Sequence, residues 1–335
     1  MAQSTLEIVE VGADDPAAVD AAFAIAGASV GADLPDFPPE CRYQYDMQFR
    51  VPPTRGPRRY FLARDGAEPV GVVQVDLPRH DNLDKAVIDI NVHPDHRRRG
   101  IGRALFAHAS AAARAEGRTG VFGFSPMTDA SSGFAAAYGL TNGLLDARRR
   151  LVVADLDEAA LDRMYADGLA KAAGYRLVHW GDTLPEEYVE DLAALDSSFL
   201  AESPMGELEY EPENVDAARV RAQHAANTAW GWRRYETGLV HEASGRLVAW
   251  TAIKAARTID WHAWQMITLV HPAHRGHRLG IVAKVANLRR MQAGEPAVTV
   301  IDTFNAADNS YMIAINEAMG FRFVDLWANW QGALA

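Results

Sequence analysis

The sequence contains His93-Pro94-Asp95-His96-Arg97-Arg98-Arg99-Gly100-Ile101-Gly102 and repeats it, altered, as His271-Pro272-Ala273-His274-Arg275-Gly276-His277-Arg278-Leu279-Gly280. Each copy follows an apolar run typical of a strand and opens a stretch typical of a helix. A basic, glycine-containing turn between a strand and a helix can bring backbone N–H groups and the positive helix end onto a pyrophosphate. The repeated stretch therefore predicts a strand–loop–helix unit that binds phosphate.

Composition and charge narrow the class of protein. The chain has 335 residues, 49% of them hydrophobic, and a formal net charge of −11. This length favours two folded domains, and the negative charge weighs against a partner that is nucleic acid or an anionic membrane. The charge does suit a cationic small molecule. With one cysteine, no signal peptide pattern at the N-terminus and no apolar run near 20 residues, we expect a cytoplasmic protein without disulfides.

The spacing of the two copies indicates a duplicated domain. They lie 178 residues apart, about the size of one α/β domain. Strands are predicted at 6–11, 60–64, 69–75, 86–92 and 120–125, and again at 175–180, 237–241, 246–253, 265–270 and 297–303. In each half a helix begins at the last glycine of the loop and ends near Gly117 or Gly294. We predict a mixed α/β fold, mainly an antiparallel sheet with helices on both faces, in two domains (1–155 and 175–335) joined by a helical connector (156–174).

The order of strand, basic loop, helix, strand and short helix resembles the GNAT acetyltransferase superfamily, here in tandem. The family's loop pattern is (Arg/Gln)-x-x-Gly-x-(Gly/Ala), and Arg97, Gly100 and Gly102 match it completely. In the second copy Arg275 and Gly280 match, but Arg278 stands at the position of the first glycine. The two-domain organisation is similar to that of mycothiol synthase, although nothing in the sequence indicates its substrate.

The resemblance implies an acetyl-CoA site at each loop, the second in doubt because of Arg278. Loop amides and arginines would bind the pyrophosphate, and the Val92 amide would polarise the thioester carbonyl. The predicted cofactor residues of the first half are Val92, His93, Arg97, Arg98, Arg99, Gly100, Ile101, Gly102 and Arg103. Those of the second half are Val270, Arg275, Gly276, His277, Arg278, Gly280, Asn305 and Asn309. The paired histidines of each loop lack a metal-ligand spacing, so we predict no metal site.

Acetyl transfer to an amine needs a base, and usually an acid for the leaving thiolate. Asp89 lies on the strand before the first loop, on the face opposite Ile88 and Ile90, and is the candidate base. A polar residue on a solvated sheet face is the alternative reading. The family's acid is a tyrosine, but Ala135 and Asn316 occupy its two positions, which leaves Tyr138 as a nearby substitute.

The sequence therefore predicts an acetyl-CoA-dependent N-acetyltransferase that acts on a small-molecule amine. In the second half Ile267 and Leu269 match the face of Asp89, so we expect the first half to be catalytic. The run of glutamates at 207–213 either holds a cationic amine or is an ordinary solvated loop. The equivalent stretch of the first half offers Asp33, Asp36, Glu40, Tyr43 and Tyr45, and neither set names a substrate. Transfer of another acyl group, a hydroxyl acceptor and a non-catalytic acyl-CoA-binding protein are alternatives. The acceptor, the number of acetyl-CoA sites and the oligomeric state are left open.

Overall fold

The computed structural model describes residues 6–202 and 204–334, which fold into two compact units. Within these limits unit 1 comprises residues 6–144, 206–211 and 328–334, and unit 2 comprises 145–202, 204–205 and 212–327. Both units combine a sheet with helices, so the predicted mixed α/β class is confirmed. Among the described residues, no helix is long and apolar enough to cross a membrane.

Unit 1 is built on a sheet with the strand order β1-β2-β3-β4-β5, next to which lies the end of β12. Neighbours among β1–β5 are antiparallel except β4 and β5, which run parallel. The elements are β1 (Leu6–Glu10), α1 (Pro16–Asp33), α2 (Arg42–Arg50), β2 (Arg58–Asp65), β3 (Glu68–Asp76), β4 (Lys85–Val92), the 3-10 helix η1 (Pro94–His96), α3 (Ile101–Ala115), β5 (Gly120–Pro126) and α4 (Asp129–Ala137).

Unit 2 has the strand order β6-β11-β10-β9-β8-β7, and the beginning of β12 lies next to β6. Its elements are β6 (Thr141–Val152), η2 (Val153–Asp155), α5 (Glu158–Lys171), β7 (Tyr175–Trp180), η3 (Glu186–Tyr188), α6 (Val189–Glu202), α7 (Ala217–Ala229), β8 (Arg233–His241), β9 (Arg246–Ala255), β10 (His262–Val270), η4 (Pro272–His274), α8 (Leu279–Gly294), β11 (Val300–Ala306), α9 (Ser310–Ala318) and β12 (Arg322–Ala333). β10 and β11 are the parallel pair of this unit.

The two halves of the chain repeat one order of elements, with α5 between them. The compact units nevertheless do not follow the limits of 1–155 and 175–335. Strand β6, which closes the first half, pairs with β11 from Asp146 to Val152 inside unit 2. Residues 328–334, which close the second half, belong to unit 1. The limits read from the sequence describe the duplication, whereas the closing strands are exchanged between the folded units.

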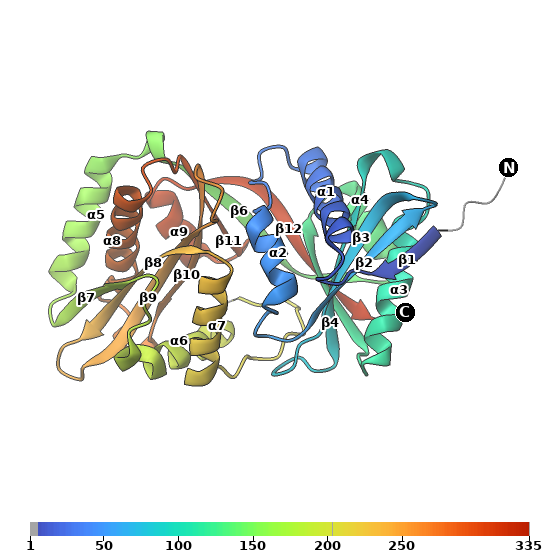
Figure 1. Ribbon diagram of the computed structural model, residues 1–335. Coiled ribbons are helices and arrows are strands. Elements are labelled where there is room, and N and C mark those ends of the chain that lie inside the picture. Colours follow the sequence, from blue (N-terminus) through green and yellow to red (C-terminus); the bar gives the residue numbers. More distant parts are fainter. Residues whose placement is uncertain (1–5, 203, 335) are drawn as a thin grey trace. The chain divides into compact units, whose positions relative to one another are not determined.

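The sheet of unit 1 is covered on both faces (Figure 1). Consecutive strand residues point to opposite faces, so Phe61 packs towards α3, against His108 (ring centroids 4.6 Å apart), while Tyr60 packs towards α2, against Tyr45 (5.7 Å). Burying one such large apolar side chain stabilises the fold by about 1.5–3 kcal/mol. Because the two cores lie on opposite faces of the sheet, each side chain of β4 points either towards α3 or towards α1 and α2.

Helix starts are set by local capping. Asp15 accepts a hydrogen bond from the amide of Ala18 (3.0 Å), and Asp157 accepts one from Ala160 (2.9 Å). Such caps satisfy backbone donors that have no partner inside the helix and contribute about 1 kcal/mol each. The helices α1 and α5 therefore begin where the sequence places an aspartate.

Candidate functional site

The first repeated loop connects β4 to α3 in unit 1. Its backbone takes the left-handed conformation twice, at Arg98 (φ 65°) and at Gly100 (φ 84°), which is the N-cap of α3. The first hydrogen bond of α3 runs from the amide of Ala104 to the carbonyl of Gly100 (3.1 Å). The amides of residues 101–103 come earlier in the helix and have no acceptor within it. They form a positive, hydrogen-bonding end suited to an anion.

The guanidinium of Arg97, a predicted cofactor residue, has partners within the protein. Its guanidinium donates to both carboxylate oxygens of Asp33 (2.6 and 3.0 Å) and to the Ser29 hydroxyl (3.0 Å), both at the end of α1. Its Nε donates to the carbonyl of Val92 (3.2 Å). Arg97 therefore ties the loop to α1 and to the end of β4.

Three arginines of the loop are exposed and line its outer side: Arg98, Arg99 and Arg103. Arg99 donates to the carbonyl of Asp95 (3.1 Å) within the same loop. The His93 ring accepts a hydrogen bond from the amide of Asp95 (3.4 Å), so this histidine caps η1. Among the described residues, no group of three or more histidine, cysteine or carboxylate side chains could hold a metal ion.

The strands on either side of this loop separate. β4 and β5 pair only from Lys85 to Val87 and from Gly120 to Phe122, although β4 continues to Val92. The amide of His93 donates to the carbonyl of Val70 on β3 (3.0 Å). Because backbone groups alternate between the two sides of an extended strand, the preceding Val92 amide points away from β3, into the opening beside β5.

Asp89 lies on the face of the sheet that α1 and α2 cover. It is opposite Gln74, which is opposite Tyr60, and directly opposed residues share a face. The Asp89 side chain is exposed to solvent, yet protein atoms surround it, so it occupies a recessed position. This surrounding and the nearby charge of Asp76 raise the pKa of Asp89, against the opposing effects of Arg58 and Asn91.

Tyr138 lies on the other face. It caps the end of α4, and its ring packs against Phe106 of α3 (ring centroids 4.4 Å apart) and Phe134 (4.9 Å). All three belong to the core beneath α3. The structure therefore does not bring Tyr138 and Asp89 together, and the packing gives the tyrosine a structural role.

The loop of unit 2 has the same backbone form as that of unit 1. Left-handed residues again lie two apart, at Gly276 (φ 85°) and at Arg278 (φ 55°), the N-cap of α8. Glycine and arginine have exchanged places, because in unit 1 the arginine comes first and the glycine second. Arg278 therefore adopts the left-handed conformation that Gly100 has in the first loop, and the loop keeps its shape with arginine in place of glycine.

The surroundings of the second loop match those of the first loop only in part. The amide of His271 donates to Val248 (2.8 Å), so the Val270 amide points towards β11, as Val92 points towards β5. β10 and β11 separate beyond Trp264 and Asp302. The ring of His277 lies within hydrogen-bonding distance of the Lys171 carbonyl (3.2 Å), which holds it on α5. Arg275 follows η4, as Arg97 follows η1.

Two asparagines predicted to bind the cofactor in unit 2 have internal partners instead. The Asn309 side chain accepts from the amide of Met312 (3.1 Å) and caps α9. The Asn305 oxygen accepts from Asn316 (2.7 Å), a buried residue of α9. Both asparagines hold α9 in place, which explains their spacing without a ligand.

The face of unit 2 that corresponds to Asp89 has a carboxyl on another strand, Glu236 of β8, which accepts a hydrogen bond from Trp250 Nε1 (2.9 Å) and whose pKa burial raises. The position of Asp89 itself is apolar in unit 2. Ile267 and Leu269 pack there against α6 in a core with Tyr188 and Leu192. Unit 2 thus has no base at the position of Asp89.

Three of the four glutamates expected at the mouth of unit 2 lie elsewhere, because residues 206–211 belong to unit 1, where Glu211 accepts from the amide of Asn82 (3.0 Å). The fourth, Glu213, belongs to unit 2 and accepts from Arg219 (2.7 Å).

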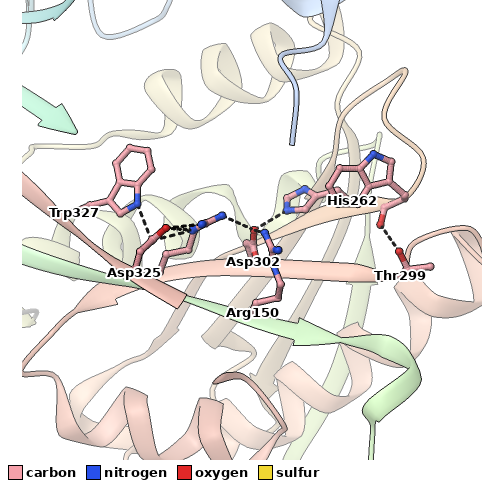
Figure 2. A network of polar contacts seen from close by, with 8 residues as sticks. Arg150, His262, Thr299, Asp302, Asp325 and Trp327 are labelled. Atoms are coloured by element: carbon pink, nitrogen blue, oxygen red, sulfur yellow. Dashed lines mark hydrogen bonds and ion pairs between the residues drawn. The ribbon is translucent and has the colours of Figure 1, made fainter. Parts of the chain in front are cut away.

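A buried ionic network joins β6, β10, β11 and β12 within unit 2 (Figure 2). Arg150 binds both carboxylate oxygens of Asp302 (2.7 Å each), and His262 lies 3.2 Å from the same carboxylate. The fully buried Arg148 bridges Asp302 (3.5 Å) and Asp325 (3.0 Å). Burial by itself would raise the pKa of Asp302, but the bonds and charges of Arg150 and His262 lower it.

Two of the first-half residues expected near the acceptor, Glu40 and Tyr45, lie close enough to Asp89 for its charge to raise their pKa. Arg58 also lies near Asp89 and lowers its pKa. The sequence did not single out Arg58, because its partner Asp76 lies on another strand. A hollow of about 450 Å³ lies where β4 and β5 begin, beside Lys85 and Gly120. It is at the opposite end of these strands from the loop, so it is not the candidate site.

Comparisons with known proteins agree with this geometry. The model of the acetyltransferase (GNAT) family matches residues 29–131. A tandem GNAT protein from the clavulanic acid biosynthesis pathway, solved without acetyl-CoA, is 32% identical, with a TM-score of 0.81 over 99% of both chains. Two GCN5-related N-acetyltransferases share the fold alone: one from Sphaerobacter thermophilus (12% identity, TM-score 0.65, 98% of this chain and 96% of that one) and one from Kribbella flavida (10%, 0.53, 98% and 70%). A search of curated proteins finds no match.

Proposed function

The chain belongs to the GNAT acetyltransferase family, and from this premise we propose that it transfers an acetyl group from acetyl-CoA to the amine of a small molecule, with unit 1 as the catalytic unit. One observation carries the assignment to unit 1. Asp89 is a carboxyl with a raised pKa on the strand that leads to the phosphate loop, and Ile267, which cannot accept a proton, stands at the equivalent position of unit 2.

The residues of unit 1 fit acetyl-CoA. The loop offers the amides of residues 101–103 and the exposed arginines Arg98, Arg99 and Arg103 for the phosphates. The Val92 amide points into the opening between β4 and β5, where an extended chain would find an unpaired strand edge. When bound, acetyl-CoA supplies a thioester carbonyl for the amine to attack and a thiol to leave.

In this proposal each protein group has one task. Asp89 accepts a proton from the acceptor's ammonium group, which frees the nitrogen lone pair. The Val92 amide donates to the carbonyl oxygen as charge develops on it. The new C–N bond forms as the C–S bond breaks, and the nitrogen releases its second proton to solvent. Solvent also protonates the leaving thiolate, because Tyr138 packs in the core on the other face.

We propose that unit 2 keeps the shape of the loop without carrying out the chemistry. The predicted residues Val270, Gly276, Arg278 and Gly280 occupy positions equivalent to Val92, Arg98, Gly100 and Gly102, which supports acyl-CoA binding there. The one cysteine, Cys41, is buried and forms no disulfide, which supports the cytoplasm as the place of action.

The test is the Asp89→Asn variant, followed by release of free thiol from acetyl-CoA with a panel of primary amines. Losing a general base lowers kcat by roughly 10²–10⁴-fold, while the KM for acetyl-CoA stays the same. Glu7→Gln, which removes one exposed carboxyl from β1, is the matched control and keeps wild-type kcat. Tyr138→Phe is expected to stay within about threefold of wild type, because its hydroxyl has no chemical task. Wild-type protein that binds acetyl-CoA but releases no thiol with any amine or alcohol would instead be an acyl-CoA-binding protein.

A further inference from the structure

An arginine and an aspartate of unit 1 form an ion pair on the sheet face that carries Asp89. Arg58 of β2 and Asp76 of β3 are directly opposed, and the guanidinium donates to both carboxylate oxygens (2.6 Å each). The third nitrogen of the guanidinium donates to Gln48 of α2. A bidentate pair holds the guanidinium in one orientation, and every nitrogen of this one has an acceptor. Arg58 is therefore fixed between β3 and α2.

One residue, Gln74, lies between this pair and Asp89. Gln74 is opposite Tyr60 on one neighbouring strand and opposite Asp89 on the other. In the orientation that gives both of its amide atoms a partner, Gln74 accepts from the Arg58 guanidinium (3.1 and 3.2 Å) and donates to the Tyr60 hydroxyl (3.0 Å). Directly opposed residues have Cβ atoms about 4.5–5.5 Å apart. A single side chain thus separates the guanidinium from the candidate base.

The two charges of the pair act on Asp89 in opposite directions. Surrounding protein raises the pKa of Asp89 most, the charge of Asp76 raises it further, and the charge of Arg58 lowers it. The other titratable groups close to Asp89 are Glu40, before α2, and Tyr45 of α2, because the Asp89 charge, after burial, raises the pKa of each. In the part of the chain that the structure describes, no lysine, arginine or histidine forms an ion pair with Asp89.

Unit 2 has neither the pair nor the base. Lys254 of β9 stands at the position of Asp76, and it is directly opposite Arg234, so this place holds two cations. Like charges that are directly opposed cannot form such a pair. Ile267 stands at the position of Asp89. The carboxylate that holds the arginine thus occurs in the unit whose strand before the loop carries an aspartate.

We propose that Asp76 is a positioning residue, whose carboxylate holds the Arg58 guanidinium and its charge away from Asp89, so that Asp89 stays free to act as the base. This inference rests on the proposed function and adds a residue to it. An arginine beside a carboxylate lowers the pKa of that carboxyl by about 1–3, which makes it a weaker base. A released guanidinium would also repel the ammonium form of the acceptor.

The test is the pH dependence of kcat at saturating acetyl-CoA. Wild-type protein is first assayed by thiol release with n-butylamine, 2-phenylethylamine, 1,4-diaminobutane and glucosamine, and the best of these amines is used throughout. Because the base must be unprotonated, the acid limb of the profile follows the pKa of Asp89 in the complex. For Asp76→Asn we expect the acid limb to move to lower pH by about 1 or more, and kcat at pH 7 to fall about 10-fold.

Two further variants separate this role from a structural one. Arg58→Gln leaves the charge of Asp76 without its partner, so its acid limb should move to higher pH. The double variant Arg58→Gln/Asp76→Asn loses both charges, so its kcat and acid limb should return to within about threefold and about 0.5 pH of wild type. Loss of folding would give no such recovery, and thermal unfolding of each variant measures it. The control Arg59→Gln breaks the adjacent pair with Glu10 (2.7 and 2.8 Å) on the other face of β2 and should keep the wild-type profile.

The outcomes distinguish this inference from the proposed function. If wild-type protein releases thiol with none of the amines, or if Asp89→Asn keeps the wild-type kcat, the proposed function is overturned and the role of Asp76 with it. If Asp89→Asn abolishes turnover, but the double variant is as slow as Asp76→Asn and the acid limb does not move, Asp76 has no role beyond folding. If Asp76→Asn does not fold, the shift in Arg58→Gln decides, and an unmoved acid limb in that variant overturns the inference.

Discussion

Exchanging the residue types at Gly100 and Arg278 tests which unit binds the phosphates. Both residues have left-handed backbone and cap the helix after the loop, with φ values of 84° and 55°. This conformation costs a residue other than glycine about 1–2 kcal/mol. A Cβ at Gly100 would approach no heavy atom closer than 3.5 Å, where Arg103 Nη2 lies, so Gly100→Arg should lower the free energy of unfolding by only that backbone term. Arg278→Gly should raise it by a similar amount.

The effect on binding is larger than the effect on stability. In Gly100→Arg a long side chain stands beside the amides of residues 101–103, which are the donors offered to the pyrophosphate. A hydrogen bond to a charged group contributes about 1.5–3 kcal/mol, so losing two weakens binding by roughly 3–6 kcal/mol, a factor of at least about 100 in Kd. Gly100→Ala separates the terms, because it carries the backbone cost with one methyl group.

The assay is calorimetric titration with coenzyme A, which gives both Kd and the number of sites per chain, alongside thermal unfolding of each variant. We expect Gly100→Arg to lose the tighter site, Gly100→Ala to keep it in weakened form, and Arg278→Gly to strengthen binding in unit 2. Unchanged stoichiometry and Kd in Gly100→Arg, with folding intact, would show that the loop of unit 1 is not the phosphate site.

Two buried charges give predictions about stability in unit 2. Asp302→Asn should lower the free energy of unfolding by about 3–5 kcal/mol in chemical denaturation, because it leaves Arg150 and Arg148 short of a buried counter-charge. Folding lowers the pKa of Asp302, so this carboxylate stabilises the fold above the ordinary aspartate pKa of about 3.9, and the stabilisation is lost as the pH falls through the lowered pKa. If Asp302→Asn loses stability in acid as steeply as wild type does, this reasoning is wrong. Lys284 is 1% exposed beneath Phe321, and burial lowers its pKa to about 7. Wild-type stability should therefore rise between pH 7 and 10, and Lys284→Met should be more stable by about 3–5 kcal/mol at pH 7, with no such rise; equal pH profiles of unfolding in the two proteins would refute the assignment.

Local patterns predicted the elements well because local interactions set them. The strand predicted at 86–92 is β4 (Lys85–Val92), and the helix predicted to end near Gly117 is α3 (Ile101–Ala115). Alternation along β4 also predicted that Asp89 faces away from Ile88, which lies in the core beneath α3. These features depend on residues a few positions apart, which a single sequence displays directly.

Features that depend on distant partners escaped prediction. Arg97 matches the family pattern, but its partner Asp33 lies 64 residues earlier, and nothing near Arg97 in the sequence indicates that bond. The sequence also did not predict that β6 joins the sheet of unit 2 and that the end of β12 belongs to unit 1. The alternation of apolar residues in a closing strand is the same whichever sheet the strand joins. Glu40, Tyr45 and Asp89 come from a loop, α2 and β4, so only the fold brings their charges within reach of one another.

The two loops show why sequence similarity and function separate in this chain. Each loop has two left-handed positions, and each fills one with arginine and the other with glycine, in opposite order. A strained residue persists where the surrounding structure fixes its backbone, so it is the packing of α3 and α8 on their strands that determines the loop shape. Glycine at position 100 therefore adds little to the fold. What it adds is a helix start without a side chain, in the same strand–loop–helix unit as Asp89, whereas unit 2 has Arg278 and Ile267 at the equivalent positions. The difference between the loops thus bears on the ligand, which is why exchanging their residues should move binding far more than stability.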